Sequence, residues 1–174
     1  MRAIGTLLLT SALSISAVEM LAACGDKFIR IGREARYGRY VAVHPAQILI
    51  YGPEKSAPSR LPELPGLLKR AGHSVRLISR PEDLGPALRA GNFDLILTGM
   101  AHADDVARQA RAVPSHPDVM PVLIEPRAAE SAAAKTLSPC MINVPFVHKN
   151  DALAEIDHRM ELRLKAAGAT GGRP

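Results

Sequence analysis

Five short apolar runs constrain the fold of this chain more than any other feature. They are rich in Val, Ile and Leu, and they cover residues 48–51, 75–78, 93–98, 119–124 and 141–147. Apolar runs of this length are typical of strands that are buried on both faces of a sheet. Pro145 lies inside the last run and lacks a backbone N–H donor, which favours the edge of the sheet for this strand.

Helical patterns separate the apolar runs. They cover residues 61–71, 81–90, 103–112, 128–136 and 151–166, and glycines follow the first two as stop signals. Strands that alternate with helices imply right-handed crossovers and a parallel sheet covered on both faces. We therefore predict a three-layer α/β domain over residues 46–166, with the flavodoxin-like strand order 2-1-3-4-5. Another three-layer strand order is compatible with the same pattern.

Residues 1–23 have the composition of a signal peptide. Arg2 precedes an apolar run over residues 3–18, which is shorter than the about 20 apolar residues of a membrane-spanning helix. The sequence Leu-Ala-Ala-Cys that ends at Cys24 resembles the lipobox of bacterial lipoproteins. The resemblance implies that Cys24 becomes the mature N-terminus and carries several acyl chains, which give stable membrane anchoring.

Gly25 follows the lipobox, where Asp often retains lipoproteins at the inner membrane. The resemblance therefore implies the periplasmic side of the cell envelope, at the outer membrane rather than the inner one. The alternative is cleavage near Ala22 or Ala23 by ordinary signal peptidase, which would leave a soluble protein.

Residues 24–45 form the expected linker between the anchor and the domain. Five cations recur there at every third position: Lys27, Arg30, Arg33, Arg36 and Arg39. Next to a lipid anchor these cations can lie on anionic headgroups, but a solvated tether is the preferred explanation. The formal net charge of +5 fits anionic partners, but no dense basic tract with interleaved aromatics indicates nucleic acid. Residues 167–174 are expected to form a disordered tail.

The chain contains two cysteines, and lipidation of Cys24 would exclude a disulfide with Cys140. We expect Cys140 to be a small buried apolar residue. No cysteine or histidine spacing indicates a metal site, and the common nucleophile, zinc-protease and nucleotide motifs do not occur, so no catalytic residue, metal or cofactor is predicted. His102 with Asp104 and Asp105 could bind a metal or act as a base, but helix capping explains the two aspartates more simply.

The sequence Phe-Asp-Leu-Ile-Leu-Thr-Gly-Met at residues 93–100 resembles the stretch that carries the phosphoacceptor aspartate in response-regulator receiver domains. The resemblance covers residues 46–164 and implies a receiver-like fold. Gly99 occupies the phosphoacceptor position, and Tyr51, Gly52 and Pro53 stand where receivers have acidic Mg²⁺ ligands. Lys149 matches the family lysine after the fifth strand. We therefore predict a pseudo-receiver that does not transfer phosphate.

Ligands of open parallel sheets bind beyond the carboxyl ends of the strands. Six residues are candidates for this rim: Tyr51, Gly52, Thr98, Gly99, Glu125 and Lys149. Our first hypothesis is a non-catalytic envelope lipoprotein whose domain binds another envelope protein or supports assembly. The alternative is a periplasmic module that binds a small ligand or metal at this rim, and a third hypothesis is an envelope enzyme with a flavodoxin-like core.

Overall fold

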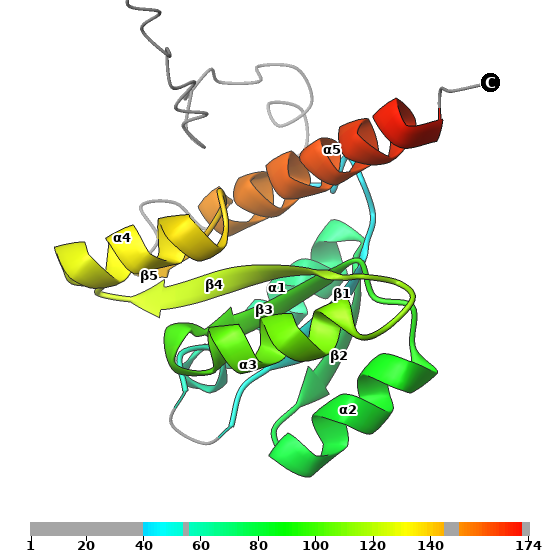
Figure 1. Cartoon of the computed structure of the whole chain (residues 1–174). Helices are drawn as coiled ribbons and strands as arrows, with labels where there is room; N and C mark the ends of the chain where they lie inside the picture. Colours follow the sequence, from blue (N-terminus) through cyan, green and yellow to red (C-terminus); the bar gives the residue numbers. More distant parts are fainter. Residues whose placement is uncertain (1–39, 54–55, 145–149, 172–174) are drawn as a thin grey trace, which may run out of the picture.

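The computed structural model describes residues 40–53, 56–144 and 150–171 (Figure 1). Within them, one sheet of parallel strands has the order β2-β1-β3-β4-β5. The strands are β1 (Gln47–Tyr51), β2 (Ser74–Ile78), β3 (Leu95–Gly99), β4 (Asp118–Ile124) and β5 (Ile142–Val144). The predicted fold class and strand order are therefore confirmed.

The helices lie between the strands as the sequence pattern predicted. They are α1 (Leu64–Ala71), α2 (Pro81–Ala90), α3 (Met100–Arg111), α4 (Ala128–Leu137) and α5 (Asp151–Gly171), and a 3-10 helix, η2 (Pro58–Arg60), precedes α1. Helix α1 begins later than predicted because Leu61 belongs to the turn after η2, where its amide donates to the Pro58 carbonyl at 3.1 Å. Helix α5 continues beyond the predicted end at residue 166 (Figure 1).

Several sequence features lie outside the described residues. They are the signal peptide with Cys24, the cationic part of the linker, Pro145 and Lys149. Within the described part of the chain, no helix combines the length and the apolar character that crossing a membrane requires.

The sheet separates two apolar cores because successive side chains of a strand point to opposite faces. Ile48 and Ile50 of β1 pack with α1 and α5, whereas Leu49 and Tyr51 pack with α2 and α3 (Figure 1). All five residues of β3 are buried, as expected for the central strand of a sheet covered on both sides. Cys140 is also completely buried, as predicted, and it is disulfide-bonded.

The end of the expected linker is packed against the domain. The carboxylate of Asp157 on α5 accepts hydrogen bonds from the Tyr40 hydroxyl at 2.5 Å, the Val43 amide at 3.0 Å and the His44 amide at 3.2 Å. The Ala42 amide donates to the Ala71 carbonyl at the end of α1, at 2.8 Å. Asp157 is 7% exposed, so one buried carboxylate joins this segment to the fold.

We predict that Asp157→Ala lowers the free energy of unfolding by about 3 kcal/mol, because it leaves three partly buried donors without their acceptor. Tyr40→Phe removes only one of these donors and should cost about 1 kcal/mol. Urea denaturation of both variants measures the difference. Equal stability of Asp157→Ala and the wild type would show that the carboxylate does not hold the segment.

His73 is a buried titratable residue that directly precedes β2. It is 4% exposed and follows Gly72, whose φ of 105° ends α1 in a left-handed conformation. Its Nδ1 accepts a hydrogen bond from the Ala46 amide at 3.3 Å, so the proton of the neutral ring lies on Nε2. Burial lowers the pKa of His73, and the charge of Asp157 opposes this shift in part.

The lowered pKa of His73 predicts a pH dependence of stability. In the unfolded chain the imidazole takes up a proton near its ordinary pKa of 6.5, while the folded protein resists protonation until a lower pH. The free energy of unfolding should therefore fall as the pH drops below 6.5, and the loss should end below the folded pKa. Above 6.5 this contribution to stability is fully present.

His73→Asn is the matched variant, because an amide oxygen can accept from the Ala46 amide and does not titrate. We expect its unfolding free energy to vary less between about pH 7.5 and pH 5 than that of the wild type. Denaturation curves at several pH values measure both slopes. Identical slopes would mean that His73 does not contribute.

Candidate functional site

The structure brings the candidate rim residues to the carboxyl edge of the sheet. Tyr51 ends β1 and lies beside Thr98 in the ladder with β3. Gly99 ends β3, and Glu125 directly follows β4. These residues therefore share one edge, as predicted, whereas Lys149 lies outside the described residues.

The loop after β1 closes over the two glycines of this edge. A Cβ atom built on Gly52 would lie 3.0 Å from the Ser59 amide nitrogen and 3.3 Å from Pro58 Cβ. A Cβ on Gly99 would lie 3.3 Å from the Ala57 amide nitrogen. Backbone and proline atoms thus lie close to both positions and leave little space for a side chain at either one.

Tyr51 points into the core rather than out from the rim. Its side chain packs in the core formed with α2 and α3, and its ring meets that of His102 edge-on at 5.7 Å between centroids. Burial raises the pKa of the Tyr51 hydroxyl, and the negative charges of Asp105 and Glu82 raise it further. The phenol therefore stays protonated at neutral pH and is not a base.

Thr98 and Glu125 face different surroundings. Thr98 is completely buried, and its hydroxyl oxygen has no hydrogen-bond partner among the described residues. Glu125 is exposed, and its φ of 47° turns the chain out of β4 while its amide donates to the Val144 carbonyl. The two side chains consequently do not form a common polar site.

The expectation that Asp104 and Asp105 lie in the first turn of a helix is wrong. Helix α3 begins at Met100 with Gly99 as its N-cap, so its first turn contains no acidic residue. Asp105 instead pairs with Arg108 on the exposed face of the helix. Among the residues that the structure describes, no group of three or more His, Cys, Asp or Glu side chains could hold a metal ion.

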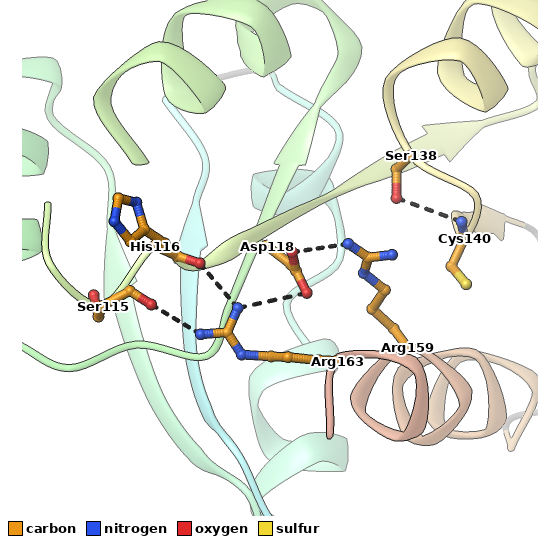
Figure 2. Close-up of polar contacts among 7 residues, drawn as sticks. All are labelled: Ser115, His116, Asp118, Ser138, Cys140, Arg159 and Arg163. Carbon is orange, nitrogen blue, oxygen red and sulfur yellow. Dashed lines mark hydrogen bonds and ion pairs between the residues drawn. The ribbon is translucent and has the colours of Figure 1, made fainter. Parts of the chain in front are cut away.

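Sequence reasoning missed a charged cluster at the opposite, amino edge of the sheet. Asp118, the first residue of β4, pairs with Arg159 at 2.8 Å and with Arg163 at 3.6 Å (Figure 2). Arg163 also donates to the Ser115 and His116 carbonyls at 2.8 and 2.9 Å. The four-residue spacing of the arginines places them on one face of α5, but the sequence does not reveal that Asp118 packs there.

The close contact at Gly52 predicts a cost for any side chain there. Gly52→Ala should lower the free energy of unfolding by about 1–3 kcal/mol, because the backbone around η2 must move. Gly66→Ala is the control: its Cβ would meet only the end of the flexible Arg70 side chain, and alanine should favour α1 by about 1 kcal/mol. Thermal denaturation measures both changes, and similar effects of the two substitutions would contradict the proposed crowding.

Comparison with known proteins supports the fold and no finer assignment. No family model and no curated protein matches the chain. A structure of NtrX from Brucella abortus in complex with ADP matches with a TM-score of 0.57 and 18% identity, over 75% of this chain and 31% of that one. The anti-anti-sigma factor PhyR from Bartonella quintana matches with a TM-score of 0.52 and 16% identity, over 73% and 52%. The chain thus spans no more than about half of either protein, and its domain has a receiver-like fold.

Proposed function

We propose that this chain is a non-catalytic lipoprotein of the cell envelope whose receiver-like domain binds another envelope protein. The observation that carries the proposal is the position of Gly99 at the end of β3. A receiver needs a carboxylate here to accept a phosphoryl group, and glycine has no side chain that can react. The Ala57 amide nitrogen, 3.3 Å from the position of a Cβ, leaves little space for one.

Among the described residues, those that directly follow β1 carry no carboxylate, which also argues against phosphotransfer. A phosphorylated receiver holds Mg²⁺ through oxygen ligands, because a hard cation prefers carboxylates and must neutralise the phosphoryl charge. Here Gly52 and Pro53 follow β1, and the described loop covers them. The same covering gives the alternative, a small-ligand site at this rim, less support than the interaction role.

The lipid anchor is proposed from the leader and its Leu-Ala-Ala-Cys sequence. Cys24 and Cys140 are the two cysteines of the chain, so a disulfide between them is the state that competes with lipidation of Cys24. A sulfur that carries a lipid thioether cannot also form a disulfide, so the two states exclude each other. The position of Cys24 directly after an apolar leader favours the lipid.

We place the interaction surface on α4, β5 and α5. Of the ten residues of α4, Ala134 is the buried one. Ala129, Ala132 and Ala133 are exposed, and small side chains allow the backbone of a partner to approach closely. Leu164 on α5 adds an apolar side chain that is 50% exposed.

Crosslinking in intact cells tests the proposal. A photo-crosslinking side chain replaces Ala133 on α4 or, as a matched control, the exposed Arg89 on α2. We expect the first variant, but not the second, to crosslink to a discrete envelope protein. We also expect labelled palmitate to be incorporated into the wild type and not into Cys24→Ser.

Three results would contradict the proposal. The first is a cytosolic protein that retains its leader, and the second is phosphate incorporation into the domain from acetyl phosphate. The third is a mature protein whose mass shows a disulfide between Cys24 and Cys140 and no lipid.

A further inference from the structure

The structure contains a shallow hollow at the amino edge of the sheet, away from the receiver rim. It has a volume of about 270 Å³ and lies among α3, α4, α5 and the start of β4. Its apolar wall includes Ala107 and Ala110 of α3, Val119 of β4 and Leu137 of α4. Helices that are distant in sequence therefore combine to form the hollow, and none of its lining residues belongs to the candidate rim at the carboxyl edge of the sheet.

The polar side of the hollow carries an excess of positive charge. Arg111 and Arg159 line it, and Asp118 is the one carboxylate among the lining residues. Asp118 is shared between Arg159 and Arg163, and Arg163 is further fixed by the carbonyls of the neighbouring loop (Figure 2). One carboxylate thus pairs with two guanidinium groups, and Arg111 adds a further positive charge at the hollow, which favours an additional anion there.

Arg159 supplies a donor that the fold leaves unused. Its Nη2 pairs with Asp118, but its Nε is buried and has no hydrogen-bond partner among the described residues. A buried donor without an acceptor is unfavourable, and such groups are uncommon in folded proteins. An acceptor that entered the hollow would remove this cost.

The loop at the mouth of the hollow is held in an unusual conformation. His116 lines the hollow and has a φ of 41°, in the left-handed region that non-glycine residues seldom adopt. The hydrogen bond from Arg163 to the His116 carbonyl fixes this turn. Strained residues persist only where the surrounding structure holds them, and they cluster at functional sites.

We propose that this hollow binds a small organic acid. The carboxylate of the ligand meets Arg159 and Arg111, since a planar guanidinium presents paired donors that match a carboxylate. The apolar part of the ligand lies against Ala107, Ala110 and Leu137. The volume is below the range of pockets for drug-sized ligands, so the acid is compact. This site does not depend on the proposed interaction surface or on lipidation.

Methyl NMR of the full-length chain in a non-ionic detergent tests the proposal, with benzoate as the probe and benzyl alcohol as its neutral counterpart. We expect saturable shifts of the Ala107 and Ala110 methyl signals with benzoate and none with benzyl alcohol. Arg111→Gln should weaken benzoate binding by about tenfold, because a charge-assisted contact is lost. Arg111 is exposed, so this variant should fold normally.

Arg108→Gln is the matched control, since Arg108 is an exposed arginine of the same helix that does not line the hollow. It should bind benzoate as the wild type does. Arg159→Lys keeps the charge opposite Asp118 but removes Nε and the paired donors, so it should also weaken binding. The proposal is overturned by an absence of saturable shifts, by equal shifts with benzyl alcohol, or by equal effects of Arg111→Gln and Arg108→Gln.

Discussion

The loop after β1 packs closely against Gly52 and Gly99, and this contact decides whether the carboxyl edge of the sheet can hold a ligand site. The Ser59 and Ala57 amide nitrogens lie 3.0 and 3.3 Å from the positions where Cβ atoms would stand. In an open parallel sheet, this edge is where side chains normally converge on a ligand. Here glycine allows the backbone to pack against the edge, so the usual site is replaced by covering structure.

The two edges of the sheet consequently differ in their chemistry. At the carboxyl edge, Tyr51 and Thr98 are buried and Glu125 points away to solvent. At the amino edge, Asp118 and its arginines form a partly buried network at a hollow that has one apolar wall. The layered fold tolerates different chemistry at its two edges, because the central strands are stabilised by apolar burial and not by the residues at their ends.

Asp157 also helps to fix the start of the domain. Asp157 is an ordinary acidic position in the helical pattern of α5, yet it accepts hydrogen bonds from a side chain and two amides more than a hundred residues earlier in the chain. The segment from Tyr40 to His44 is therefore packed on the domain. Any anchor that precedes this segment would be connected to one defined place on the fold.

The sequence by itself determined the layered α/β fold, because apolar runs such as residues 95–97 alternate with helical patterns, and this alternation is typical of a parallel sheet covered on both faces. It also identified Gly99 as a position that cannot be phosphorylated. Only the tertiary structure decided that η2 covers the carboxyl edge, that α3 begins at Met100 rather than at Ala103, and that Asp118 pairs with Arg159. Hydrophobic periodicity indicates which residues of one helix or strand are buried. These contacts join segments that are distant in sequence, and no local pattern indicates which distant segments will meet.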